Sequence, residues 1–232
     1  MVDNVPQEGF GDDIHRGARM LISLLPGGGA AVELFNRLLA PPIQRRRDAW
    51  LNGLAERIAR LEQEGRVKID DLQQSDEFIS TVMQASQAAV RNHQKEKLDA
   101  LRNAVLNTAL GQAPNDAERE MFLEWVDTLT VCHLRVLSFL SAPRAGTDAQ
   151  QLNMDLTTGD HAAVIAVLQN AFPDLKGEGD FVQKIVSDLD REGLILGDVT
   201  LRTVHGLEGM HNLTNLGDKF LRFISEPKEA GR

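Results

Sequence analysis

Few residues of this chain have the types and spacing that chemistry requires, and the most suggestive pair is Cys132 followed by His133. A thiol beside an imidazole is a combination that nucleophilic catalysis uses. The surrounding pattern predicts an apolar helix, however, and adjacent residues of a helix point about 100° apart, so the two side chains would not face each other. A lone cysteine in such a helix is typical of a small buried hydrophobic residue. We therefore expect no catalytic residue at this position.

The other candidate motifs lack the partners that their chemistry needs. His205 and His211 are spaced as in half of a zinc site, but neither a Cys pair nor an acidic helix motif completes the set. The glycines at 27–29 are not followed by Lys-Ser or Lys-Thr, so they do not form a phosphate-binding loop. Paired acids such as Asp188 and Asp190 have polar surroundings that would leave their acidities unperturbed. The sequence predicts no catalytic, cofactor-binding or metal-binding residue, and thus no enzyme.

The elements that position the remaining candidates follow a helical period. Of the 232 residues, 42% are hydrophobic and 25% are charged, which is typical of a globular protein. Apolar residues recur at spacings of three and four, and no strand-like alternation appears before about residue 194. We expect a mainly α fold, with a flexible lead at 1–11 and a helical bundle at 12–130. The helices expected in the bundle span residues 12–25, 30–39, 43–64, 75–110 (as one bent helix or two) and 115–130.

Proline and glycine divide the first helices into an apolar hairpin over residues 20–43. Pro26 with the following glycines should end one helix, and Pro41-Pro42 should end the next. The hairpin carries more apolar residues than a small bundle buries, and large exposed apolar patches mark partner sites. We expect a homodimer formed through this hairpin, with these contact candidates: Leu24, Leu25, Leu34 and Phe35.

The densest positive cluster, Arg45, Arg46 and Arg47, directly follows the hairpin and is a candidate contact for anions or a membrane surface. The alternative is a solvated first turn of a helix paired with nearby acids. Three charges at about 1 kcal/mol each do not anchor a protein stably to lipid. The longest uncharged run, at 20–32, has 13 residues, whereas a spanning helix needs about 20. We therefore expect a cytoplasmic protein without membrane attachment, and the single cysteine fits a reducing compartment.

The last hundred residues have a different character and resemble a winged-helix module. Helices expected at 131–140, 160–172 and 180–192 precede a short β-ribbon between 194 and 214, and Thr214 caps a final helix. Two segments carry the resemblance: Leu-Asp-Arg-Glu-Gly-Leu-Ile, at 189–195, and Leu-Thr-Asn-Leu-Gly-Asp-Lys-Phe-Leu, at 213–221. In winged-helix proteins the first ends the third helix and the second follows the wing. We expect 131–232 to form this module; the alternative is a helical bundle whose glycines only end helices.

The whole chain also resembles a group of bacterial helical proteins. In that group a Pro-Gly-Gly-Gly turn, here at 26–29, precedes a charged helix. A helix like His-Leu-Arg-Val-Leu, here at 133–137, opens a winged-helix-like C-terminal part. Some members are associated with abortive phage infection, the alpha type among them. The resemblance implies a bacterial protein with a role in phage defence, and it carries over no catalytic residue.

Charge decides between DNA and protein as the partner of the module. Residues 131–232 hold 10 basic and 14 acidic residues, a net charge of −4, and the whole chain has a net charge of −9. DNA binding depends largely on neutralising phosphates, so this sign disfavours it. Asp188 and Glu192 lie four apart on the third helix and should project from one side as a protein-docking surface, with Ile185 and Leu189 facing the core.

The sequence therefore predicts a non-enzymatic protein that acts in regulation or assembly through protein contacts. A winged-helix DNA-binding regulator that dimerises through its helical part is the first alternative. A peripheral membrane effector that uses residues 20–43 is the second.

Overall fold

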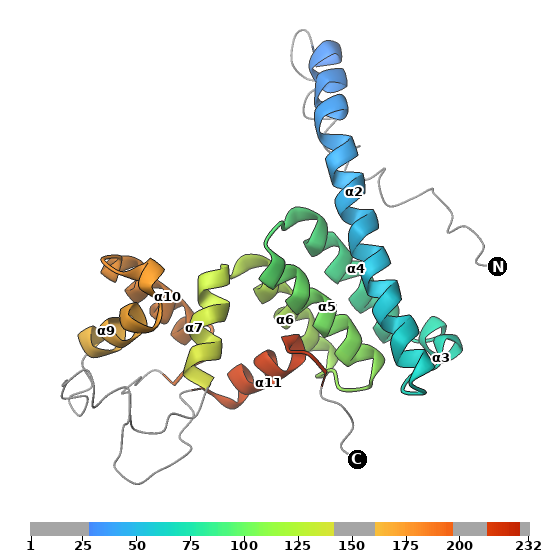
Figure 1. The fold of residues 1–232 in the computed structure, drawn as a ribbon. Helices are drawn as coiled ribbons and strands as arrows, with labels where there is room; N and C mark the ends of the chain where they lie inside the picture. Colours follow the sequence, from blue (N-terminus) through green and yellow to red (C-terminus); the bar gives the residue numbers. More distant parts are fainter. Residues whose placement is uncertain (1–27, 142–160, 197–212, 228–232) are drawn as a thin grey trace. The chain divides into compact units, whose positions relative to one another are not determined.

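The computed structural model describes residues 28–141, 161–196 and 213–227, and this part of the chain is mainly helical, which confirms the expected class. The lead expected at 1–11 lies outside the described residues. The helices follow one another along the chain as drawn in Figure 1. They are α2 (Gly28–Gln63), α3 (Ile69–Gln73), α4 (Asp76–Arg91), α5 (Lys95–Ala109), α6 (Asp116–Thr128), α7 (Val131–Ser141), α9 (His161–Ala171), the 3₁₀ turn η2 (Pro173–Leu175), α10 (Gly179–Arg191) and α11 (Asn215–Ile224).

Helix α2 corrects the predicted apolar hairpin, because it runs without a break through Pro41 and Pro42. Proline removes a hydrogen-bond donor, yet its own φ angle is helical, so a helix with good helix formers on both sides can continue through it at a cost. The side chain of Arg45 donates to the carbonyl of Pro41 at 3.3 Å. The break expected at Pro41-Pro42 is therefore wrong, and the part of the hairpin before Gly28 lies outside the described residues.

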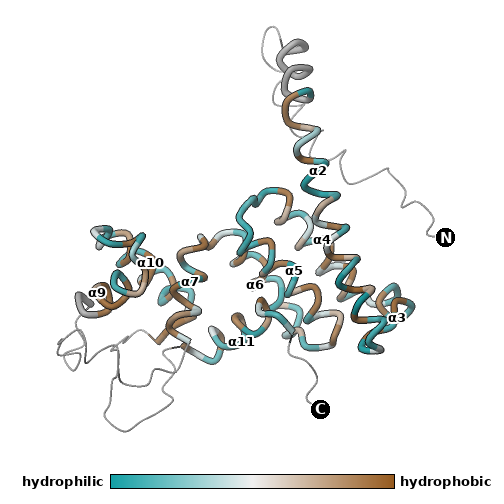
Figure 2. The backbone as a smooth tube through the Cα atoms, viewed as in Figure 1, coloured by the Kyte–Doolittle hydropathy of each residue, from teal (hydrophilic) through white to brown (hydrophobic). Residues whose placement is uncertain are grey.

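The chain divides into two units within α2, residues 1–52 and residues 53–232. In the second unit, α5 packs against α4, α6 and α11, while α10 packs against α7 and α9. Figure 2 shows hydrophobic and hydrophilic segments alternating along α5, α10 and α11, as expected for helices with one buried face. The boundary expected at 130/131 falls inside this unit, and α11 contacts helices on both sides of it, α5 and α7.

An aromatic cluster joins α6 to α11 in the core of the second unit. Phe122 lies 5.4 Å from Phe220 and 6.0 Å from Phe223 between ring centroids, and Trp125 lies 5.5 Å from Phe220. Such offset and edge-on pairs add about 0.5–1.5 kcal/mol each beyond their burial. The last helix is thus part of the main core.

Several helix ends form where the sequence predicts them. Side-chain caps begin three helices: Ser75 accepts from the N–H of Phe78 at 3.2 Å, Asn115 from that of Glu118 at 3.0 Å, and Thr214 from that of Gly217 at 3.0 Å. The segment 75–110, left open as one helix or two, is two helices, α4 and α5.

The end of α10 forms around Gly193, as expected. Its φ of 69° lies in the left-handed region that glycine adopts without strain. The N–H of Leu194 donates to the carbonyl of Leu189 at 2.9 Å, and the N–H of Gly193 donates to that of Asp190 at 2.8 Å. This pattern is a Schellman motif, which satisfies the free carbonyls at a helix C-terminus.

The predicted β-ribbon is represented by one antiparallel bridge between Ile195 and Leu213. Residues 197–212, where most of the ribbon was expected, lie outside the described residues. Between 28 and 130 the structure contains no strand, as the helical period predicts. The order α7, α9, α10, bridge, α11 is compatible with a winged helix, but the described residues contain no complete ribbon.

Candidate functional site: a polar network at Asp188

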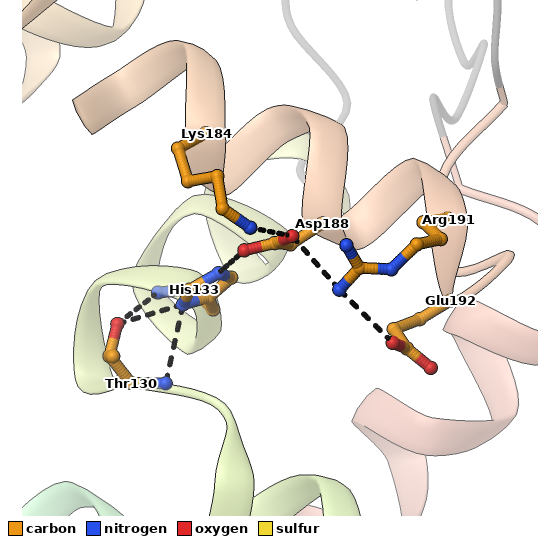
Figure 3. A network of polar contacts seen from close by, with 6 residues as sticks. All are labelled: Thr130, His133, Lys184, Asp188, Arg191 and Glu192. Carbon is orange, nitrogen blue, oxygen red and sulfur yellow. Dashed lines mark hydrogen bonds and ion pairs between the residues drawn. The ribbon is translucent and has the colours of Figure 1, made fainter. Parts of the chain in front are cut away.

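A network of polar side chains connects α7 to α10, and it centres on Asp188. Helix α7 buries His133 on the same face as Leu134 and Leu137, and α10 buries Ile185 and Leu189 as the sequence predicts. Asp188 lies at the edge of the buried face of α10, and its side chain is only 13% exposed. Figure 3 shows His133, Lys184 and Arg191 converging on this carboxylate.

Thr130 and His133 form a capping box at the start of α7. The hydroxyl of Thr130 accepts the N–H of His133 at 3.4 Å, and Nδ1 of His133 accepts the N–H of Thr130 at 3.2 Å. In the usual capping box, Glu or Gln occupies the position that His133 takes here. The imidazole therefore supplies the acceptor that the first turn of α7 needs.

This geometry sets the tautomer of His133. A backbone N–H can only donate, so Nδ1 must offer its lone pair to Thr130 and the neutral ring carries its proton on Nε2. Nε2 lies 3.4 Å from Oδ2 of Asp188, and it donates in that direction. Burial lowers the pKa of His133, and the hydrogen bond and charge of Asp188 oppose this effect.

Two cations of α10 complete the surroundings of Asp188. Lys184, one turn earlier, donates to Oδ1, and Arg191 lies 3.0 Å from the same oxygen. The hydrogen bond from Lys184 is the main cause of the lowered pKa of Asp188, and the bond from His133 adds to it. Asp188 therefore stays ionised and pairs with both cations, sharing its single negative charge between them.

These contacts correct the expected surroundings of the two acids of α10. Asp188 was expected to be a solvated acid, but it is mostly buried and holds three partners. The carboxylate of Glu192 accepts the indole N–H of Trp125 at 3.1 Å, and its side chain is 33% exposed. Because both acids tie α10 to neighbouring groups, the surface they were expected to offer is largely used within the fold.

Thr130, His133 and Asp188 place a hydroxyl, an imidazole and a carboxylate in a row, which is an arrangement that nucleophilic catalysis uses. The oxygen of Thr130 is 2.8 Å from Nδ1 of His133, whose other nitrogen faces Asp188. Here, however, the backbone N–H of Thr130 already uses the lone pair of Nδ1, and the hydroxyl accepts the N–H of His133. The arrangement serves the first turn of α7.

Sequence reasoning missed His133, Lys184 and Trp125 as partners of the two acids. A signal existed for part of the set, because Thr-x-x-His at 130–133 has the spacing of a capping box. Lys184 and Asp188 also have the i,i+4 spacing of a helical ion pair.

The arginine cluster lies in the middle of α2, which differs from the expected first turn of a helix. Arg45 and Arg46 are exposed, while Arg47 is half-buried and lies 3.7 Å from Asp48. Successive residues of a helix point about 100° apart, so the three guanidinium groups do not share one face.

The predicted dimer contacts are only partly within the described residues. Leu24 and Leu25 lie outside them, and Leu34 and Phe35 belong to α2, whose side chains are described from Arg37 onward. His205 and His211 also lie outside.

Exposed apolar residues are present on α2. Leu38 is 61% exposed and Leu39 is 40% exposed. None of the side chains from Arg37 to Ala49 is buried, and the first buried one is Trp50.

Comparison of the chain with protein-family models, curated proteins and solved structures finds no match. Within 28–141, 161–196 and 213–227, His, Cys, Asp and Glu side chains form no group of three or more that could hold a metal ion. No helix in those ranges has the length and apolar character needed to cross a membrane.

Proposed function

We propose that this protein acts through protein contacts and that α2 is its contact helix, with a second copy of the chain as the first partner. The observation that carries the proposal is the exposure of Leu38 and Leu39 on a stretch of α2 without a buried side chain. The two side chains point about 100° apart, so they expose apolar surface on neighbouring sides of α2, and exposed apolar surface marks partner sites.

Physical stability supports the same proposal. Among the described side chains none from Arg37 to Ala49 is buried, a helix gains most of its stability in water from packing, and Pro41 and Pro42 each remove a backbone hydrogen bond from this segment. Packing of Leu38 and Leu39 against another surface would compensate for that loss. A two-fold dimer uses the same patch on both subunits, so Leu38 and Leu39 of one copy could meet those of the other.

The C-terminal helices are proposed to form a winged-helix-like module that docks protein. The order α7, α9, α10, bridge, α11 supports the module, and the Schellman motif at Gly193 supports the position of its third helix. A regulatory role, including one in phage defence, follows from the resemblance described above and belongs to the proposal.

DNA binding is the less favoured alternative because of the Asp188 network. In a winged helix the third helix presents its cations to the major groove. Here that helix is α10, and both of its cations, Lys184 and Arg191, are paired with Asp188. Binding a phosphate backbone would require breaking those pairs.

Membrane attachment is also less favoured. The side chains of Arg45, Arg46 and Arg47 are distributed around α2, and Arg47 is close to Asp48. A flat anionic surface would meet only part of this cluster.

The experiment that tests the proposal is analytical ultracentrifugation of the full chain at tens of micromolar. We expect the wild type to self-associate and the variant L38Q/L39Q to need at least a tenfold higher concentration, since two apolar contacts on each copy are lost. The matched control is I79Q/M83Q, which replaces two residues of α4 that are 41% and 43% exposed. A monomeric wild type, or equal weakening by both variants, would overturn the assignment to α2.

Two further measurements separate the alternatives. Tight duplex binding that falls steeply with salt would favour the DNA-binding regulator. Co-flotation with anionic liposomes that is lost in R45A/R46A/R47A would favour the membrane effector.

A further inference from the structure

We propose that the capping box of His133 is a proton-sensitive joint, which loosens the contact between α7 and α10 in weak acid. The inference is independent of self-association through α2. It rests on the position of one imidazole between the start of α7 and the carboxylate of α10 (Figure 3).

Protonation of His133 removes a hydrogen bond at the start of α7. Nδ1 of His133 accepts the backbone N–H of Thr130 at 3.2 Å. A proton on Nδ1 places a donor against that donor, so the N–H of Thr130 loses its acceptor. The hydroxyl of Thr130, 2.8 Å from Nδ1, can then accept from the ring, but the reciprocal pattern of the capping box is lost.

The charges around the imidazole of His133 determine how well its protonated form is tolerated. Asp188 on α10 favours the imidazolium, and its hydrogen bond to Nε2 becomes an ion pair. Lys184 on α10 and Lys97 on α5 oppose the positive charge. Lys97 is held in place by its bond to the carbonyl of Asp127 at 2.8 Å. Asp188 also shares its charge with Lys184 and with Arg191, so it only partly compensates a buried imidazolium.

The pKa of His133 determines the pH range in which the contact between α7 and α10 weakens. Burial keeps the pKa of His133 below its ordinary value of 6.5. A state in which α7 and α10 separate exposes the ring and restores the ordinary pKa, so that state takes up the proton first. The stabilisation is therefore fully present above pH 6.5 and is lost as the pH falls from 6.5 through the lower pKa of the folded protein. Asp188 stays ionised throughout this range because its own pKa lies below 3.8.

The matched variant is H133Q. A glutamine carbonyl can accept the N–H of Thr130, and its amide can donate to Asp188, so both hydrogen bonds have a substitute that does not titrate. Any other group that titrates in the same range acts equally in the wild type and in the variant.

The test is urea unfolding of the full chain, with hydrogen exchange of the α7 amides, at about pH 7.5 and about pH 5.5. We expect the opening equilibrium constant of the wild type to rise, relative to H133Q, by up to about tenfold per pH unit below 6.5. Nitrogen NMR of the wild type should show the Nε2–H tautomer and a pKa for His133 below the ordinary histidine value of 6.5.

Three results would overturn the proposal. One is an equal pH dependence of opening in the wild type and in H133Q. The second is a pKa of His133 above the ordinary value of 6.5, because acid would then strengthen the contact between α7 and α10. The third is the Nδ1–H tautomer at neutral pH, which would exclude the capping-box bond from Thr130. The NMR result requires no variant, so it stands even if H133Q folds poorly.

Discussion

Gly217 is the residue at which the packing of α11 leaves least room. A Cβ atom at this position would lie 2.0 Å from the carbonyl oxygen of Leu194 and 3.3 Å from the side chain of Leu213. The carbonyl of Leu194 is itself fixed, because it accepts the N–H of Thr214 at 3.1 Å. Only glycine allows this approach without a shift of backbone.

We predict that Gly217→Ala lowers the free energy of unfolding by about 1–3 kcal/mol, the usual cost of forcing atoms into a packed site. The control is Gly179→Ala in α10, where a Cβ meets nothing within 4 Å and the gain in helix propensity should leave stability equal or higher. Urea denaturation of both variants measures the difference. Equal stability of the two variants would show that α11 does not pack on Leu194 as described.

Asp188 is the residue on which the polar contacts between α7 and α10 depend. Asp188→Asn removes the charge that pairs with Lys184 and Arg191 while it keeps the shape of the side chain. We predict a loss of about 1–3 kcal/mol in the free energy of unfolding, since hydrogen bonds to charged groups contribute that much. Asp190→Asn, at an exposed position on the same helix, is the control and should change stability little. Thermal unfolding that shifts equally for both variants would contradict the network.

At the scale of elements, α5 holds the end of α11. The last carbonyls of a helix have no partners within it. Asn107, which is 3% exposed, donates to the carbonyls of Phe223 at 2.7 Å and Ser225 at 2.9 Å, and Asn103 donates to that of Ile224 at 3.0 Å. Two asparagines one turn apart on α5 thus cap α11 from the side.

We predict that Asn107→Ala destabilises the protein by about 1–3 kcal/mol, because buried carbonyls lose their donor. Hydrogen exchange should then speed up in α11 more than in α4. Asn103→Ala removes one bond at a half-buried position and should have the smaller effect on both measurements. If Asn103→Ala lowers the free energy of unfolding as much as Asn107→Ala does, Asn107 is not the main donor to the carbonyls at the end of α11.

The same elements show what sequence patterns could and could not predict. Helix starts at Ser75, Asn115 and Thr214 were predicted correctly, because a cap and its helix are neighbours in sequence. The break expected at Pro41-Pro42 was wrong, because this local stop signal competes with good helix formers on both sides, whereas the end expected near Glu64 agrees with the observed end at Gln63. Proline and its helix-forming neighbours favour opposite outcomes here, and the sequence alone does not show which of the two effects is larger.

The candidate site was harder to predict for a different reason. His133 and Asp188 are 55 positions apart, and the bond between them depends on how α7 packs against α10. Asp188 looked like a solvated acid because its sequence neighbours are polar, whereas its burial comes from a distant helix. The sequence was sufficient to select Asp188 as a candidate, but its partner His133 could be identified only from the tertiary structure.

At the scale of the whole molecule, the central claim is that the first half of α2 is held by a second copy of the chain. The most direct measurement is hydrogen exchange of the amides from Arg37 to Ala49 at several protein concentrations. The account predicts that protection of this segment rises with concentration, because mass action populates the dimer, while protection of α5 stays constant. Protection of residues 37–49 that does not change between low and high micromolar concentration would contradict the claim.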